Sequence, residues 1–319
     1  MTKILRRRVR GYLVAVSMLA VVTGFSVSPA YGHSTPAAVE ARSVDCSAFS
    51  PLAQLTSGAG VDAARGGDAR EPASTEAAVE VPASAKGKGG PGFKATVPVW
   101  FHVLHDGAEG NLSFEQVTAQ VNVLNTTFGG GEGGYDSGFR FKLAGITRTD
   151  NATWFRHGYG DKAERDMKKT LRRGGWETLN LYSTQASAYL GWAYFPGLPE
   201  SRQYLDGIVV DWESMPGTST RYAGRYDQGE TATHEAGHWL NLHHVFQGGC
   251  NNWGDYVADT PPQLIATNGC PTGQDSCSEP GMDSIHNYMD YSYDSCYYEF
   301  SAGQAARMQD AWLYFRANG

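Results

Sequence analysis

The 319-residue sequence has only five cysteines, no CxxC pair, no apparent internal repeat and, beyond its first 32 residues, no stretch apolar enough to cross a bilayer. The absent CxxC pair argues against a zinc finger. Positive charge is also scarce: 26 Lys and Arg stand against 33 Asp and Glu, and the net charge of −7 argues against a general nucleic-acid binder. Hydrophobic residues make up 41%, which is typical of a globular protein and excludes collagen, coiled coil and disorder throughout.

The first 32 residues have the three parts of a secretory signal peptide. Five Lys and Arg fall within the first ten residues, residues 12–25 are almost wholly apolar, and small residues lead up to position 32. The apolar run is short for a membrane span of about 20 residues. We therefore expect residues 1–32 to be removed on export, and the mature protein to be secreted, extracellular and not bound to a membrane.

The next segment differs in composition from the rest of the chain. Residues 57–92 are rich in Ala and Gly and contain no aromatic residue. Such a segment buries too little apolar surface to offset the entropy lost when its backbone is ordered. We therefore interpret residues 33–92 as a propeptide or flexible linker, and residues 93–319 as the folded, functional domain.

Apolar periodicity after residue 93 predicts strands and helices in mixed order. Strands are expected at 96–105, 139–149, 178–183, 191–196 and 207–212. Helices are expected from Ser113 with Gln116 as its capping-box partner, at 161–173, from near Asp227 with Glu230 completing the cap, and at 302–317. The stretch from 243 to 301 is loop-rich. We therefore predict an α/β (α+β) domain with a smaller, loop-rich C-terminal subdomain.

The segment HEAGHWLNLHH at residues 234–244 contains His-Glu-x-x-His inside a predicted helix. Residues i and i+4 share one helical face, so the imidazoles of His234 and His238 can bind one metal ion, and zinc accepts imidazole nitrogen readily. Glu235 would lie beside the metal, where a carboxylate can take a proton from a water on the zinc ion. A bare HExxH also occurs by chance on charged helices, so the motif alone is only moderately specific.

The third ligand decides the class of metal site. The next Glu in the chain, Glu279, lies in a cysteine-flanked loop and fits poorly, whereas Asp255 and Asp259 are downstream candidates. In metzincins the longer pattern HExxHxxGxxH delivers a third His after a sharp turn. His244 has this spacing, and the neighbouring His243 is off by one residue.

Two more positions bear on this pattern. Asn241 stands where the pattern has Gly, a tolerable departure because Asn is the best non-Gly residue in the left-handed region. Met289 lies in the sequence HNYMDY, downstream of His244. Metzincins place a Met beneath the zinc ligands in a tight turn, because its soft, adaptable side chain makes a hydrophobic floor. The extended zinc motif and this Met together favour a zinc site over an incidental helix face.

Four of the five cysteines lie close together, at positions 250, 270, 277 and 296. In an exported protein they indicate two disulfides, although the sequence leaves three pairings open. Cys46 is left over, before the Ala- and Gly-rich segment.

The sequence resembles the pappalysin, or cytophagalysin, family of metzincins, and within it the secreted microbial and fungal extracellular metalloproteases. The resemblance covers roughly residues 95–319. The matching segments are GWAYFP (191–196), DGIVVDW (206–212), HEAGHWLNLHHVFQGGC (234–250), VADTP (257–261) and HNYMDYSYDSC (286–296). It implies a metzincin-like fold with a twisted mixed sheet and an active-site helix, and a secreted zinc endopeptidase that acts on proteins or peptides as a monomer.

The resemblance also implies roles for single residues. His234, His238 and His244 bind zinc, Glu235 is the general base, and Met289 is the residue of the Met-turn. Tyr291 matches the family's tyrosine near zinc, whose phenol is expected either to interact with the metal or to stabilise the tetrahedral intermediate; the alternative is a packing aromatic. The segment 191–196 resembles an edge strand on which a peptide substrate adds as an antiparallel strand. The implied disulfides are Cys250–Cys277 and Cys270–Cys296.

Two further expectations follow from relatives. Calcium is expected in the loop after the zinc helix, where Asp255, Asp259 and Thr260 offer hard oxygen ligands. Cys46 is expected to keep the unprocessed enzyme silent by occupying the fourth position on zinc. The alternatives for Cys46 are a thiol without consequence or an intermolecular disulfide. A different class of function, a zinc-stabilised binding protein without activity, is disfavoured because a structural site needs no base at Glu235.

Overall fold

The structure, a computed structural model, describes residues 72, 79–186, 188–251 and 254–317. All of them belong to the second of two compact units, which runs from Leu52 to Gly319. The predicted signal peptide and Cys46 lie outside the described residues. Within the described part of the chain, no helix has the length and apolar character needed to cross a membrane.

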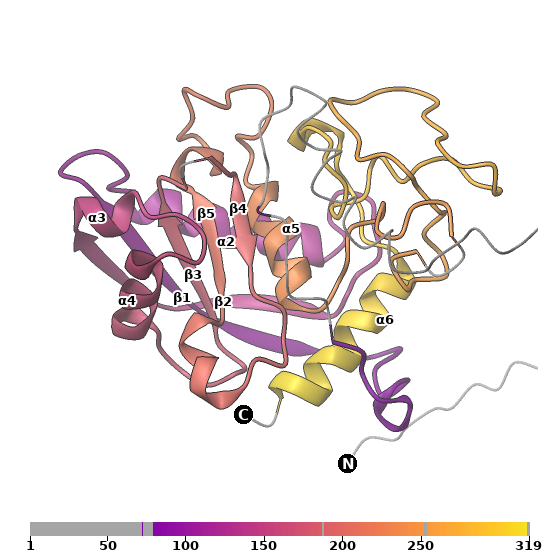
Figure 1. Ribbon diagram of the computed structural model, residues 1–319, viewed down its shortest axis with the longest axis horizontal. Helices are drawn as coiled ribbons and strands as arrows, with labels where there is room; N and C mark the ends of the chain where they lie inside the picture. Colours follow the sequence, from indigo (N-terminus) through magenta and orange to yellow (C-terminus); the bar gives the residue numbers. More distant parts are fainter. Residues whose placement is uncertain (1–71, 73–78, 187, 252–253, 318–319) are drawn as a thin grey trace, which may run out of the picture. The chain divides into compact units, whose positions relative to one another are not determined.

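A five-stranded mixed sheet in the order β2-β1-β3-β5-β4 forms the framework (Figure 1). Its strands are β1 (Ala95–His105), β2 (Phe139–Asp150), β3 (Leu179–Thr184), β4 (Gly191–Ala193) and β5 (Ile208–Asp211). The first four strands in this order are parallel, and β4 runs antiparallel to β5 at one edge. All six residues of β3 are buried, as expected for a central strand that is covered on both faces.

The two faces of the sheet carry separate hydrophobic clusters because side chains alternate along each strand. On β5, Ile208 and Val210 join one cluster and Val209 joins the other. The first cluster contains α2 (Phe114–Phe128) and α5 (Glu230–Trp239), and the second contains α3 (Ala152–Phe155) and α4 (Lys162–Leu171). Helix α5 therefore lies against the sheet on the α2 side.

Helix starts follow local capping chemistry. Ser113 caps α2 in a capping box with Gln116, and Asp161 accepts a hydrogen bond from the backbone N–H of Glu164 at the start of α4. The last helix, α6 (Ala302–Ala311), begins with the same box between Ser301 and Gln304 and continues as a π-helix to Arg316.

Helix α5 differs from its expected start. It begins at Glu230 after Gly229, whose φ of 103° is accessible mainly to glycine, and no side chain caps it. Asp227 instead accepts a hydrogen bond from the N–H of Gly224. All ten residues of α5 are buried. They include its four acidic or imidazole side chains: Glu230, His234, Glu235 and His238.

Residues 79–92 also differ from the flexible linker that their composition indicates. A 3₁₀ turn at Ala83–Ala85 packs Val81 and Ala85 against Ala311, and Phe315 covers the same cluster. Backbone N–H groups of this segment hydrogen-bond to side chains of α6. Composition underestimates order here because polar contacts with α6 add to the small apolar area that the segment buries.

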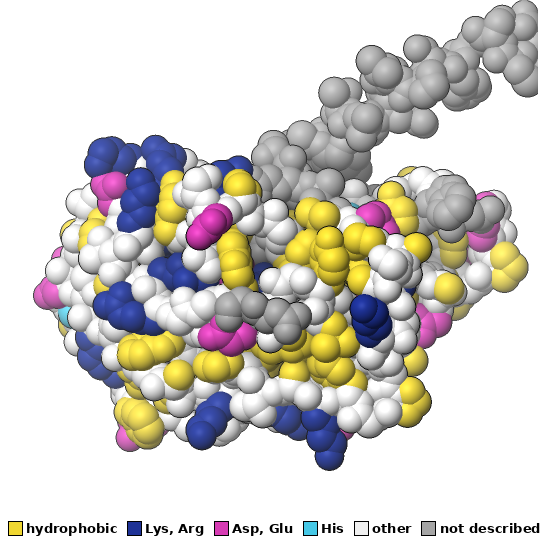
Figure 2. Space-filling model, turned by 90° about the horizontal axis from the view of Figure 1, so that it is seen from below, with side chains coloured by type: hydrophobic (Ala, Val, Ile, Leu, Met, Phe, Trp, Pro, Cys, Tyr) yellow, Lys and Arg dark blue, Asp and Glu magenta, His cyan; other side chains and the backbone are white. Residues whose placement is uncertain are grey.

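The segment after α5 is loop-rich, as predicted. Between 249 and 300 it holds one short 3₁₀ turn, Asp294–Cys296, and isolated bridges, and it lies beside α5 in orange to yellow (Figure 1). Disulfides join Cys250 to Cys277 and Cys270 to Cys296, the pairs that the resemblance implied. Figure 2 shows the molecule from below the view of Figure 1. On this face, hydrophobic side chains and single Asp and Glu separate groups of Lys and Arg side chains.

Candidate active site

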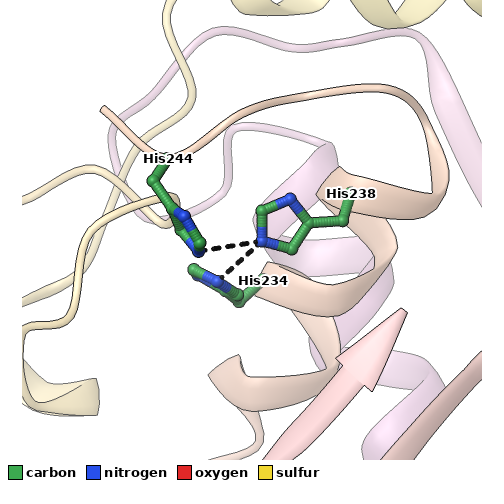
Figure 3. Close-up of side chains that lie close together, drawn as sticks. All are labelled: His234, His238 and His244. Atoms are coloured by element: carbon green, nitrogen blue, oxygen red, sulfur yellow. Dashed lines mark hydrogen bonds between the residues drawn. The ribbon is translucent and has the colours of Figure 1, made fainter. Parts of the chain in front are cut away.

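Three imidazoles converge at the end of α5 (Figure 3). The helix presents His234 and His238 on one face, and His244 reaches them from the chain that follows the helix. The Nε2 atom of His238 lies 3.0 Å from Nε2 of His234 and 3.1 Å from Nε2 of His244. These three ring nitrogens form one of the groups of His, Cys, Asp and Glu atoms in the described residues that lie close enough to hold one metal ion.

The hydrogen bonds of the other ring nitrogens decide what these atoms can bind. Nδ1 of His234 donates to the carbonyl of Tyr288 at 2.6 Å, and Nδ1 of His238 donates to the carbonyl of Leu242 at 2.7 Å. Each Nε2 then carries a lone pair, and lone pairs about 3 Å apart repel unless a cation lies between them. A tetrahedral zinc ion with Zn–N bonds of about 2.0–2.1 Å separates its nitrogen ligands by about 3.3 Å, so the residues fit zinc.

The third histidine depends on the turn at Asn241. This residue has φ of 79°, and the N–H of Leu242 reaches back to the carbonyl of Gly237. The backbone thereby reverses direction within two residues, as the glycine of the longer pattern would allow. Phe246 stacks on the ring of His244, with centroids 4.6 Å apart, and holds it toward the other two rings.

The other candidates for the third ligand lie elsewhere. His243 packs between Phe195 and Tyr256, and burial, together with the positive charge of Arg307, lowers its pKa to about 3. It is therefore a neutral packing residue. Glu279 lies with the sulfur atoms of Cys250 and Cys277 rather than with the imidazoles.

Met289 lies directly beneath α5. A Cβ on Gly237 would come within 2.4 Å of the Met289 sulfur, so any larger residue at this helix position would displace the Met289 side chain. The turn is held by a hydrogen bond from the Met289 N–H to the Asn287 side chain, and the Met289 carbonyl accepts from the N–H of Val245. The turn at Met289 thus contacts both α5 and the segment that carries His244.

Glu235 and Tyr291 line one pocket together with His234. A Cβ on Gly191, the first residue of β4, would lie 2.9 Å from Oε1 of Glu235, so the carboxyl adjoins the edge strand. The ring of Tyr291 lies 5.7 Å from that of His234 and 5.0 Å from that of His244. A base and a phenol therefore both adjoin the candidate metal position.

A small pocket, with a cavity volume of about 30 Å³, adjoins this site, and two acidic residues without an expected role in the site line it. Glu230 and Asp294 line it together with Glu235 and Tyr291. Burial raises the pKa of Glu230 to about 10, and the nearby Asp294 adds to this rise. Burial also raises the pKa of Asp294 to about 6, although its hydrogen bond with Glu230 opposes the rise. At neutral pH the pair therefore holds one proton and one negative charge. Residues 199–300 contain 15 Asp and Glu, and nothing in the sequence singles out these two.

Of the three residues expected to bind calcium, Asp255 and Thr260 are in contact, whereas Asp259 is engaged at the start of α6. Both oxygens of the buried Asp255 carboxylate accept from the Thr260 hydroxyl, at 2.8 and 2.9 Å. Asp259 accepts instead from the Ser301 hydroxyl and the Gly303 N–H at the start of α6. Asp255 and Asp259 therefore each stabilise a separate loop contact in this structure.

Comparisons with known proteins agree with this geometry. Residues 186–312 match the M43 peptidase family model, described as pregnancy-associated plasma protein-A. An extracellular metalloprotease of Arthroderma benhamiae is 45% identical over 229 residues, covering 70% of this chain and 74% of its own length. An extracellular metalloprotease of Neurospora crassa is 43% identical over 230 residues, covering 70% of this chain and 76% of its own length.

A solved structure shows the same fold. Mature mirolysin of Tannerella forsythia, in complex with a cleaved peptide, matches with a TM-score of 0.59 and 30% identity over 69% of this chain and 92% of its own. A mutant of promirolysin from the same organism matches with a TM-score of 0.60 and 29% identity over 70% of this chain and 81% of its own. With the mixed sheet, the three converging imidazoles and the Met-turn, these matches show that the chain belongs to the pappalysin (M43) family of metzincin proteases and is a zinc-dependent metalloendopeptidase.

Proposed function

We propose that His234, His238 and His244 hold the catalytic zinc ion, and that Glu235 is the general base for hydrolysis of internal peptide bonds. The single observation that carries this proposal is the convergence of the three imidazoles: the Nε2 atoms of His234 and His244 both lie within 3.1 Å of His238 Nε2. A bound zinc ion acidifies a water molecule and polarises the scissile carbonyl.

Glu235 moves the proton in this scheme. Its carboxylate takes a proton from the attacking water and passes it to the leaving amine, so one group serves as base and then as acid. The position beside β4 suits this role, because the scissile bond of a peptide laid along that strand would pass the carboxyl. Burial of Glu235, which is 2% exposed, excludes bulk water from the proton transfer.

Tyr291 supports the developing oxyanion. Its ring adjoins two of the three imidazoles, so its hydroxyl is able to donate to the negative charge that forms on the substrate carbonyl. The backbone N–H of Tyr291 donates to Asp290, which also accepts from Gln263. These contacts hold the tyrosine backbone at a constant place beneath the site.

Strand β4 is the proposed docking edge for the substrate. It pairs with β5 on one side, and a peptide adds on the other side as a further strand. Side chains of β4 and the residue after it anchor the strand. Trp192 Nε1 donates to the buried Glu164 carboxylate at 2.8 Å, and the Tyr194 hydroxyl donates to its other oxygen at 3.2 Å. Lys168 neutralises that carboxylate at 3.0 Å.

The pocket beside Glu235 is proposed to take a substrate side chain next to the scissile bond. Its one negative charge, shared by Glu230 and Asp294, favours a side chain that carries positive charge, Lys or Arg. Digestion of a peptide library with the purified enzyme, followed by mass spectrometry, measures the preference. We expect an excess of basic residues at one position next to the cut, and a weaker preference in Asp294→Asn. A preference without basic residues at any position would refute this assignment.

The same digestion tests the chemistry. The proposed site is supported if casein cleavage stops with a zinc chelator and returns with added zinc. Casein that stays intact with zinc-loaded protein points to a binding protein without activity. Four expectations stay predictions. They are secretion after removal of residues 1–32, the monomeric state, calcium binding by Asp255, Asp259 and Thr260, and latency through Cys46.

A further inference from the structure

We propose that residues 79–90, here called the strap, belong to the mature enzyme and position the zinc site through Asn241. The inference rests on the proposed zinc site and concerns how its third ligand is held. The strap contacts the turn that connects His238 to His244, although 162 positions separate Val79 from Asn241 in the chain.

Asn241 is the point of contact. It is fully buried, its backbone has φ of 79°, and its side-chain Nδ2 donates to the carbonyl of Val79 at 2.9 Å. Glycine would adopt this backbone with less strain, but it has no donor for that carbonyl. Asn in place of the family's glycine therefore adds backbone strain and gains a hydrogen bond to the strap.

Through the turn, this hydrogen bond affects the orientation of the proposed metal ligands. Leu242 directly follows Asn241, and its carbonyl accepts from Nδ1 of His238 at 2.7 Å. The ring of His238 is thus oriented by a group next to the strap contact, and His244 follows two residues later. Groups that orient a metal-binding imidazole typically change metal affinity by about 10–100-fold when removed.

The strap is tied down at several places along α6. The carboxylate of Asp310 accepts from the N–H groups of Gly87, Lys88 and Gly89 at 2.7–3.3 Å. Arg307 of the same helix donates to the carbonyl of Asn241 at 2.8 Å and pairs with Glu80 of the strap at 3.4 Å. One arginine therefore joins the turn to the strap a second time.

The strap also meets the substrate side of the molecule. A Cβ on Gly197, just after the segment GWAYFP, would lie 3.1 Å from a methyl carbon of Val79. The strap thus contacts both the zinc turn and the chain that follows β4. A propeptide segment that is discarded on activation would take these contacts away, so the maturation cut is expected before Val79.

A double-mutant cycle in the full-length chain tests the inference. Asn241→Gly keeps the turn and removes the donor to Val79, and Asp310→Ala releases the strap from α6. The readout is the rate at which zinc passes to a colorimetric chelator, measured alongside the melting temperature. We expect about tenfold faster zinc release in Asn241→Gly, a smaller increase in Asp310→Ala, and no further increase in the double variant, because both act through one contact.

A matched control separates positioning from general destabilisation. Asn125→Asp removes a side-chain donor that joins α2 to the carbonyl of Phe141 in β2, away from the imidazoles. It should lower the melting temperature and leave zinc release unchanged. Wild-type zinc release in Asn241→Gly, additive effects in the double variant, or equal acceleration in Asn125→Asp would each overturn the proposal. A wild-type protein without bound zinc would instead refute the zinc site itself.

The N-terminus of the active enzyme gives an independent measurement. Mass spectrometry of the naturally processed, active protein should find a start at or before Val79. A fully active enzyme that starts after Gly90 would show that the strap is dispensable and would overturn the inference.

Discussion

The sheet with α5 and the loop-rich segment 249–300 supply different parts of one active site and are stabilised by different means. The sheet side depends on backbone hydrogen bonds and on one apolar cluster that includes Val99, Phe101 and Trp239. The loop segment adds Tyr288, Met289 and Phe300 to the same cluster. It depends in addition on two disulfides and on buried side-chain hydrogen bonds, such as those that Asp290 accepts from Gln263 and Thr267. The proposed metal ligands and the proposed base come from α5 and its turn, and Met289 and Tyr291 come from the loops.

The comparison teaches that catalysis and stability are separable in α5 but joined in the loop segment. A helix buried along its whole length keeps its place when one polar side chain is changed. A loop without regular structure has few backbone hydrogen bonds, so the loss of a cross-link that restrains its backbone entropy is expected to disturb its geometry. Each of the following predictions tests one side of this contrast.

The largest effect is expected from Glu235→Gln. The amide has the shape of the carboxylate but does not accept the proton, so kcat should fall by about 10³-fold while zinc content and melting temperature stay close to wild type. Peptide hydrolysis, metal analysis and thermal melting measure the three quantities. Near-wild-type activity in a folded, zinc-loaded variant would remove Glu235 from the mechanism.

His244→Ala should weaken zinc binding by more than about 100-fold, since it removes a direct ligand rather than a supporting group. His243→Ala is the matched control: it loses packing against Phe195 and Tyr256 but keeps the metal. Zinc content after dialysis against a weak chelator distinguishes the two variants. The reverse result would assign the third ligand to His243.

Removal of either disulfide should lower the free energy of unfolding by about 3 kcal/mol, given the 26 or 27 positions between the joined cysteines. Only the loss of Cys270–Cys296 should also lower kcat, because Gly269 pairs with Ser292 next to Tyr291. Denaturant unfolding and kinetics of paired Cys→Ser variants measure both. Equal kcat in the two variants would contradict the link between this disulfide and the site.

A smaller effect is expected from Asp255→Asn as pH changes. Burial raises the pKa of Asp255 from 3.8 to about 6, so its contribution to stability is full below pH 3.8 and is lost as pH rises through 6. Asn does not titrate. The stability of the variant relative to wild type should therefore increase by about 2 kcal/mol from about pH 4.5 to about pH 7 in calcium-free buffer.

Added calcium provides the contrasting condition for Asp255. If the predicted calcium site forms, the ion favours the charged carboxylate, so calcium should raise the melting temperature of wild type at neutral pH and have a smaller effect on Asp255→Asn. Equal melting temperatures with and without calcium, at constant zinc, would refute that site. A relative stability that does not change with pH would refute the raised pKa.

The sequence predicted the framework well where the information is local. The strands near 95–105 and 139–150 and the capping box at Ser113 follow from alternation and from chemistry within four residues. The start of α5 was misplaced because Gly229 uses backbone freedom rather than a capping side chain. Residues 79–92 were interpreted as a linker because their partners lie more than 200 positions away on α6.

The sequence by itself determined the metal chemistry, because the helical period alone brings His234 and His238 to one face with Glu235 beside them. The resemblance added the cysteine pairing and the Met-turn. Only the tertiary structure brought His244 rather than His243 to the other imidazoles, buried Glu230 beside Asp294, and joined Asn241 to Val79. These contacts depend on how distant segments pack, and the direction of a side chain after a turn is decided by its tertiary partner, which no local pattern encodes.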